Sequence, residues 1–237
     1  MAELVRATPR CVVAVYAHPD DPDVSSGGTL ARWAADGAQV HVVLVAKGEK
    51  GSPDPGTDPG QLVARRARES DAAAVVLGVA GIHRLGRPDG AFENDEPLRR
   101  DLVRVLRRVR PDALLCPDPL AVFFGEHYYN HRDHRVVGYA ALDAASPAAA
   151  SPLYFPEEGP AWQVEVAYLS GSLEANVHVD VSATISQKVA AVLCHETQLG
   201  PDPARFRPVI EGRAAEAGRA AGVAFAESFR RIRLASG

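Results

Sequence analysis

The sequence predicts an α/β protein whose mostly parallel, Rossmann-like sheet is flanked by helices. Short apolar runs, such as residues 11–17, alternate along the chain with longer segments of helical spacing. The runs are rich in Val and Leu, which suit strands that are buried on both faces. The connections between them are long enough for the crossover helices that parallel strands require.

The bulk composition excludes several classes of protein. At 237 residues the chain is long enough for one domain with a large core, and we expect residues 1–237 to form a single domain. A net charge of −4 argues against nucleic-acid binding, and no stretch reaches the length of a membrane span. The three cysteines show no paired spacing, and no export signal is evident. We therefore expect a cytoplasmic protein.

The first strands and helices follow from local patterns. Residues 11–17 form an unbroken apolar run, which predicts a buried strand. Residues 22–28 are rich in Pro, Ser and Gly and predict a loop, followed by a helix over residues 29–35. Residues 39–46 predict a second strand. The Gly- and Pro-rich residues 47–60 predict an exposed, mobile loop.

The middle of the chain continues this alternation. Residues 61–77 show a helical pattern that ends at Gly78, a typical C-terminal cap. A short strand over residues 82–86 precedes a turn, and residues 97–109 have the spacing of an amphipathic helix. Residues 111–117 predict another buried strand.

The last part of the chain is less regular. Residues 136–142 have helical propensity, and residues 164–169 and 177–181 alternate like strands. Helices are expected over residues 184–195 and 213–229.

A cluster of polar residues, His18, Asp20 and Asp21, directly follows the first predicted strand. In parallel sheets this edge collects ligands and catalytic groups. A catalytic zinc site typically has three ligands from His and carboxylate. His18 and Asp21 lie three residues apart around a turn stiffened by Pro19, so they can converge on one ion, and His134 can complete the set from another loop. Asp20 then remains as a general base for the attacking water.

Each motif has an ordinary explanation when taken alone. The first can be a capped turn, and the pair His131 and His134 can be structural or exposed. Their joint occurrence, each after a predicted strand, favours a metal site. Since His and carboxylate accept several divalent ions, Fe²⁺ and Co²⁺ remain alternatives to Zn²⁺.

The sequence resembles the LmbE-like (PIG-L) zinc-dependent N-deacetylases over most of its length. The matching motifs are residues 17–21, 27–31, 88–90, 131–134 and 179–182, with Arg66, Lys188 and His195. The resemblance implies that His18, Asp21 and His134 bind the metal. It also implies that Asp20 is the general base and returns a proton to the leaving amine.

The same resemblance implies further roles. His131 is expected to stabilise the tetrahedral oxyanion as an imidazolium, with Asp133 orienting it and keeping it protonated. Tyr129 is expected on the oxyanion side, and Arg66 and Asp89 are expected to contact the substrate. Two ordinary alternatives stay open. Tyr129 can be an aromatic residue that only fills space in the loop, and Arg66 can form a surface ion pair with Glu69 on its helix.

Two features leave roles undefined. Many family members place Glu directly after the two aspartates, whereas this chain has Pro22 and then Asp23. His195 matches a family histidine to which we assign no role beyond the rim of the site.

These observations predict a metal-dependent hydrolase that cuts a linear amide bond. The expected small-molecule substrate carries an N-acyl group, most simply N-acetyl, on a glucosamine-type sugar. One alternative is an amidase for a larger acyl or thiol conjugate, or a deacylase that tailors an antibiotic or lipid. Another is a ligand-binding domain without hydrolytic chemistry, although no G-x-G-x-x-G follows the first strand.

The sequence leaves the physiological substrate, the native metal and self-association into a homo-oligomer open. Substrate choice depends on loops that vary most readily in shape. We expect these variable loops at residues 47–60, 120–128 and 146–161.

Overall fold

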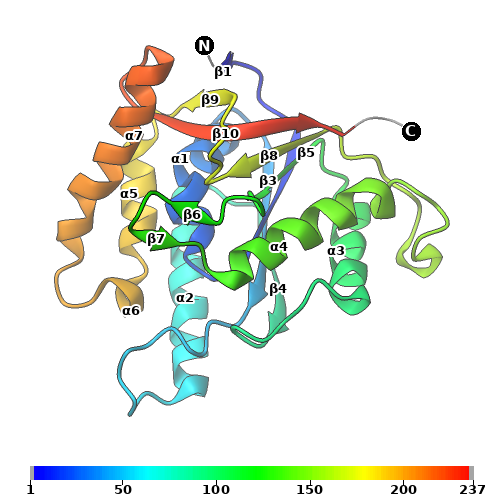
Figure 1. Cartoon of the computed structure of the whole chain (residues 1–237), viewed down its shortest axis with the longest axis horizontal. Coiled ribbons are helices and arrows are strands. Elements are labelled where there is room, and N and C mark those ends of the chain that lie inside the picture. Colours follow the sequence, from blue (N-terminus) through cyan, green and yellow to red (C-terminus); the bar gives the residue numbers. More distant parts are fainter. Residues whose placement is uncertain (1–2, 235–237) are drawn as a thin grey trace.

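The computed structural model describes residues 3–234 and is built on one eight-stranded sheet (Figure 1). Its strands are β1 (Glu3–Val5), β2 (Cys11–Tyr16), β3 (Gln39–Ala46), β4 (Gly81–Arg87), β5 (Ala113–Pro117), β8 (Val166–Ser170), β9 (Val177–Asp180) and β10 (Ala226–Arg233). They lie in the order β1-β9-β10-β8-β5-β2-β3-β4. From β8 to β4 all neighbours are parallel, whereas β10 runs antiparallel to β8 and β9. The predicted mostly parallel, Rossmann-like sheet is confirmed.

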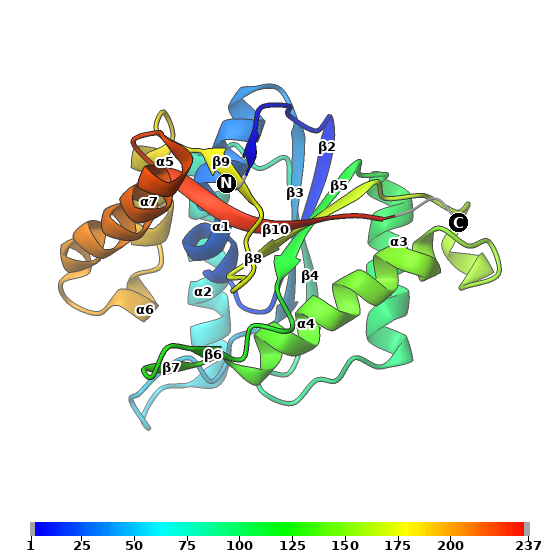
Figure 2. The same cartoon turned by 45° about the horizontal axis from the view of Figure 1, so that its top comes forward.

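Helices cover both faces of this sheet (Figures 1 and 2). They are α1 (Asp21–Ala35), α2 (Pro59–Leu77), α3 (Glu96–Val109), α4 (Arg132–Asp143), α5 (Ile185–Leu193), α6 (Glu196–Leu199) and α7 (Arg207–Ala221). One apolar core lies between the sheet and α1, α2 and α5, and the other lies between the sheet and α3 and α4. A small separate hairpin, β6 (Phe123–Phe124) and β7 (Tyr128–Tyr129), precedes α4.

Strand β2 shows why a strand covered on both faces has apolar residues at every position. Val13 and Val15 point into the core beneath α3 and α4, whereas Val12, Ala14 and Tyr16 point into the core beneath α1 and α2. Since side chains alternate between the two faces of a strand, a strand covered on both faces reads as a continuous apolar run. The predicted strand is confirmed, and its end fixes where His18 lies.

The predicted loop over residues 22–28 is wrong, because helix α1 begins at Asp21 and contains all of these residues. Pro22 is tolerated in the first helical turn, and the two acidic residues of that turn suit the positive end of the helix dipole. The glycines serve close packing. A Cβ atom at Gly28 would lie 2.8 Å from the Val181 side chain.

The predicted helix over residues 213–229 is also wrong in its second half. Helix α7 ends at Ala221, where Gly222 adopts a positive φ of 74° as a C-terminal cap. The chain then enters strand β10, where Phe229 is fully buried in the sheet. Residues 226–229, which were expected to end the helix, therefore belong to this strand.

Strand β10 also carries a buried carboxylate to helix α1. Glu227 accepts hydrogen bonds from the backbone N–H groups of Gly28 (3.0 Å) and Thr29 (2.8 Å) and pairs with the Lys188 ammonium. Lys188 in turn donates to the carbonyl of Val24 at 2.8 Å. The Glu227–Lys188 ion pair thus hydrogen-bonds to backbone groups of α1 that would bond to one another in a regular helix.

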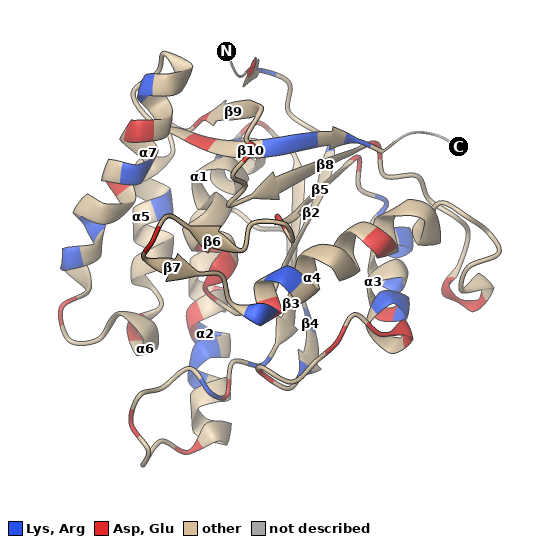
Figure 3. Cartoon of the chain, viewed as in Figure 1, with Lys and Arg blue, Asp and Glu red and all other residues tan. Residues whose placement is uncertain are grey.

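Charged side chains are distributed over several elements, with acidic residues between the basic ones (Figure 3). On α3, for example, Arg100 pairs with Glu96 and Arg104 pairs with Glu158. Within residues 3–234, none of the helices combines the length and the apolar character that a bilayer crossing demands.

Candidate metal centre

Residues from distant parts of the chain meet at the carboxyl end of the parallel strands. His18 and Asp21 follow β2, Asp89 follows β4, and His131 and His134 follow β5 at the start of α4. The segment between β3 and α2 and the β6–β7 hairpin lie at the same end of the sheet (Figure 2). This edge is where parallel α/β sheets hold their ligands.

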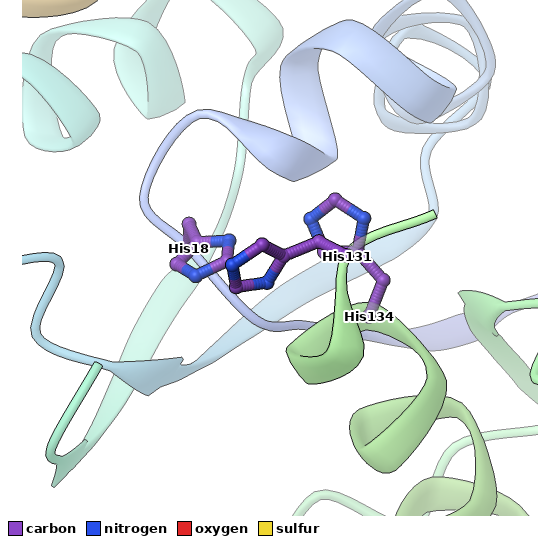
Figure 4. A group of neighbouring side chains, drawn as sticks. All are labelled: His18, His131 and His134. Carbon is purple, nitrogen blue, oxygen red and sulfur yellow. The ribbon is translucent and has the colours of Figure 1, made fainter. Parts of the chain in front are cut away.

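Three histidines form the centre of this cluster (Figure 4). One ring nitrogen from each of His18, His131 and His134 lies within 4.8 Å of the others. The ring of His18 is centred 5.1 Å from that of His131 and 5.3 Å from that of His134. Two segments more than a hundred residues apart in sequence therefore place their imidazoles together.

Asp21 connects two of these histidines. One carboxylate oxygen lies 3.3 Å from Nδ1 of His18 and the other lies 3.2 Å from Nε2 of His134. Asp21 also accepts the backbone N–H of His18 at 2.8 Å, which fixes the turn. Burial alone would raise the pKa of Asp21, but His134 and His18 hold it well below its usual range.

Asn130, which lies outside the predicted site residues, orients His134. Its Nδ2 donates to the Ala121 carbonyl, so its Oδ1 is free to accept from Nδ1 of His134 at 3.0 Å. When His134 is neutral, that bond keeps the proton on Nδ1 and leaves Nε2, which faces Asp21, available to a metal. Metal-binding histidines are commonly fixed in this way through their second nitrogen.

The other side of His18 faces two more carboxylates. Its Nε2 lies 3.2 Å from Asp89 and 3.5 Å from Asp133. Asp133 is fully buried and accepts the backbone N–H of Gly90 at 2.7 Å. Burial would lower the pKa of His18, but Asp21, Asp133 and Asp89 together raise it far above its usual range. The pocket therefore favours a positive charge at its centre.

The donor set fits a divalent metal. Two ligand atoms that each lie about 2.0–2.1 Å from a tetrahedral zinc are about 3.3 Å apart. One Asp21 oxygen lies 3.3 Å from Nδ1 of His18, and the other Asp21 oxygen lies 3.2 Å from Nε2 of His134. On the other side of His18, one ligand atom each from His18, Asp89 and Asp133 lies within 4.8 Å of the others. Within the described part of the chain, the buried Oδ1 of Asp133 also has no hydrogen-bond partner. These residues can hold a metal ion, and their chemistry alone does not select one divalent metal over another.

Asp20 lies beside this cluster and is held by Arg66. Nη2 of Arg66 donates to Asp20 at 2.7 Å, and Nη1 donates to the Gly48 carbonyl at 3.0 Å. Arg66 is only 2% exposed, whereas the Asp20 side chain is 26% exposed. Cβ atoms at Gly48 and Gly51 would lie 2.4 Å and 2.5 Å from Nη1 of Arg66, so both glycines permit the loop to close over the guanidinium. The Arg66 guanidinium is thus bound to the Asp20 carboxylate and the Gly48 carbonyl.

His131 differs from the expected imidazolium. It caps helix α4, and its Nδ1 accepts the backbone N–H of Asp133 at 3.2 Å, which requires an unprotonated nitrogen. Burial and the charge of His18 lower the pKa of His131. The carboxylate of Asp133 contacts the Gly90 N–H and His18 instead of His131. With Nδ1 occupied by the Asp133 N–H, Nε2 is the nitrogen of His131 that remains for other contacts.

The remaining predicted residues have other contacts. The Asp89 carboxylate contacts His18, while its backbone N–H donates to Glu49 and its carbonyl accepts from Lys50. The hydrogen bond with His18 lowers the pKa of Asp89. Tyr129 is largely exposed, and its hydroxyl accepts from Arg135 at 2.6 Å.

Asp23, in the first turn of α1, and His195 lie in contact with each other. Asp23 is buried and lies 2.7 Å from Nε2 of the buried His195. Although burial would lower it, the pKa of His195 is raised by this contact. The pair supports the helical turn that carries Asp21.

Known proteins resemble the chain in sequence and in structure. The sequence model of the PIG-L family, described as GlcNAc-PI de-N-acetylase, matches residues 13–145. A diacetylchitobiose deacetylase from Thermococcus kodakarensis is 30% identical over 225 residues, covering 92% of this chain and 82% of the relative. All of the predicted site residues lie inside the matched family segment.

Two further similarities agree. A 1D-myo-inositol 2-acetamido-2-deoxy-alpha-D-glucopyranoside deacetylase from Geodermatophilus obscurus is 35% identical over 67% of this chain, and the match spans only 60% of that relative. The fold superposes on an N,N'-diacetylchitobiose deacetylase from Pyrococcus horikoshii with a TM-score of 0.86 and 26% identity. That superposition covers 95% of this chain and 84% of the other.

Proposed function

The chain belongs to the PIG-L family of GlcNAc-PI de-N-acetylases, and we propose that it is a metal-dependent hydrolase that removes the N-acetyl group from a glucosamine-type unit of a small substrate. The observation that carries this proposal is the convergence of His18, Asp21 and His134, with the carboxylate of Asp20 beside them. The substrates named for both relatives contain an acetamido sugar, which supports this substrate class.

The proposed ligands are His18, Asp21 and His134, and the proposed metal is zinc. A His-His-carboxylate set that leaves one position open is typical of catalytic zinc sites. A divalent metal held there supplies Lewis-acid chemistry, polarising the amide carbonyl and acidifying water. Fe²⁺ and Co²⁺ accept the same donors, so elemental analysis of the purified protein and reconstitution with each ion decide the identity.

The residues of the chain then divide the proton transfers. Asp20 takes a proton from the attacking water and later gives it to the nitrogen of the leaving amine, so that water and amide become amine and acetate. Its position is set by the bond to Arg66. We assign Arg66 this positioning role in place of substrate contact.

His131 is proposed to donate from Nε2 to the oxygen that becomes negative as the carbonyl is attacked. Its Nδ1 is held by the backbone N–H of Asp133, which orients the ring. The Asp133 carboxylate contacts His18. Asp89, which lies beside His18, is proposed to accept hydrogen bonds from the sugar.

The proposal is tested by acetate release from N-acetylglucosamine and N,N'-diacetylchitobiose, with metal content measured on the same samples. We expect His18→Ala and His134→Ala to lose both metal and activity. Asp20→Asn should keep the metal while kcat falls about 10²–10⁴-fold, the usual contribution of a general base. The exposed Asp202→Asn is the matched control. Full activity in the Asp20 variant would refute the assigned role.

A further inference from the structure

The β6–β7 hairpin concentrates aromatic side chains beside the metal centre. The whole chain contains seven Phe, six Tyr and two Trp. Four of these, Phe123, Phe124, Tyr128 and Tyr129, lie within seven consecutive residues. A hairpin this short has no core of its own, so packing alone gives no reason for the concentration.

Three of these four rings face solvent. Phe123 is 64% exposed, Tyr128 is 51% exposed and Tyr129 is 58% exposed. Exposed apolar side chains that cluster in one place mark sites where another molecule binds. The hairpin projects at the end of the sheet that holds the metal centre (Figure 2).

The hairpin is joined firmly to the site. Asn130 closes it, with its backbone N–H donating to the Val122 carbonyl at 2.8 Å and its Nδ2 donating to the Ala121 carbonyl at 2.7 Å. The Oδ1 of the same residue holds His134. Tyr129 precedes His131 by two residues, so their Cα atoms are at most about 7.6 Å apart. One side chain therefore links the hairpin to a proposed metal ligand.

The two faces of the hairpin have different surroundings. Phe123 pairs with Tyr129 across the strands, and their ring centroids are 5.6 Å apart. Arg135, on the first turn of α4, lies over the Tyr129 ring at 5.2 Å and binds its hydroxyl. On the other face, Phe124 lies beside Gly171, in the turn between β8 and β9. The Phe123–Tyr129 face is thus the one on the side of the α4 turn that carries the site histidines.

We propose that the Phe123–Tyr129 face binds a second sugar ring, the group attached to the glucosamine unit whose N-acetyl group is removed. This inference rests on the proposed function and extends it from one sugar ring to two. A pyranose ring has one face of C–H groups, which packs on an aromatic face, and a rim of hydroxyl groups, which stays wet. Arg135 and the Tyr129 hydroxyl stand beside the rings to contact such hydroxyl groups.

The experiment compares N,N'-diacetylchitobiose with methyl N-acetylglucosaminide, using metal-loaded wild type, Phe123→Ala and Tyr128→Ala. Tyr128 is the matched control, since it is an exposed aromatic on the opposite face of the same hairpin. The measured quantity is the ratio of kcat/KM for the disaccharide to kcat/KM for the monosaccharide. We expect wild type to prefer the disaccharide and Phe123→Ala to lower the ratio about threefold to tenfold, as expected for one aromatic contact. Tyr128→Ala should keep it.

Other outcomes overturn the inference. Wild type without a preference for the disaccharide, or an equal ratio in all three proteins, removes the second-ring site while leaving the deacetylase proposal intact. If Phe123→Ala changes the molar mass in light scattering and leaves the ratio unchanged, the face is an interface between two copies of the chain.

Absence of deacetylation in all three proteins would count against the proposed function instead. The inference is then decided by calorimetric titration of the metal-loaded proteins with N,N'-diacetylchitobiose. Weaker binding by Phe123→Ala than by Tyr128→Ala supports the second-ring site, and equal affinities or no binding overturn it.

Discussion

Replacing Arg66 by Lys tests how the proposed general base is held. Arg66 donates from two nitrogens, to Asp20 at 2.7 Å and to the Gly48 carbonyl at 3.0 Å, while only 2% exposed. Lysine keeps the positive charge but has a single nitrogen on a flexible stem, so it cannot reproduce this fork. One of the two acceptors must lose its partner.

The magnitude follows from these contacts. Loss of one charge-assisted hydrogen bond costs about 1.5–3 kcal/mol, which lowers Tm by about 3–12 °C in a chain of this size. If Asp20 is the acceptor that loses its partner, its carboxylate moves relative to the water, and a displacement of about 1 Å costs on the order of 10²-fold in rate. We therefore expect kcat to fall about 10- to 100-fold with KM nearly unchanged, because Arg66 has almost no surface for a substrate.

The assay is steady-state acetate release at saturating metal, with Tm measured on the same preparations. Arg68→Lys, an exposed position on the same helix, is the matched control and should retain both kcat and Tm. Gly51→Ala should reproduce part of the Arg66 effect, since its Cβ would lie 2.5 Å from Nη1 of Arg66. A raised KM with unchanged kcat in Arg66→Lys would refute the positioning role and restore Arg66 as a substrate contact.

Three further outcomes are expected. Removal of the metal with a chelator should abolish activity. Because nearby carboxylates raise the pKa of His18 in the metal-free site, metal binding must displace protons. The affinity of the protein for the metal should therefore rise from pH 6 to pH 8, as measured by calorimetry in two buffers. Arg107 is buried and donates to six backbone carbonyls, so Arg107→Met should lose about 3–5 kcal/mol of unfolding free energy in urea, whereas the exposed Arg108→Met should stay within about 0.5 kcal/mol. The pKa values of both Asp23 and His195 are raised on folding. The free energy of unfolding of wild type, relative to that of the Asp23→Asn/His195→Gln double variant, should therefore decline as pH rises through the folded pKa of His195. A difference in unfolding free energy that stays constant from pH 6 to pH 9 would contradict this.

The sequence predicted the parts of the structure that depend on neighbouring residues. The run before His18 is apolar at every position because both faces of β2 are covered, so its pattern alone locates the strand and its end. His18 and Asp21 are also a local pair, held by the turn between them. Their meeting with His134 could be anticipated because successive parallel strands bring their ends to one edge.

Contacts between distant residues could not be predicted in this way. Arg66 and Asp20 are 46 residues apart, and nothing in the helix pattern around Arg66 separates a buried arginine from an exposed one. Asp133 was expected to act on His131, its neighbour by two residues, yet its carboxylate turns to Gly90 and His18. Asn130 has a weak signal, since it stands directly before the His-x-x-His pair, but its role depends on the hairpin that it closes.

The position of β10 has a consequence for how the chain folds as it is synthesised. Of the strands described, β10 leaves the ribosome last, yet it inserts between β8 and β9 inside the sheet. Until residue 227 emerges, the N–H groups of Gly28 and Thr29 lack their carboxylate acceptor, and β9 has no bridge to β8. A nascent chain can thus carry every proposed catalytic residue and still wait for its final strand to fix the helix that begins at Asp21.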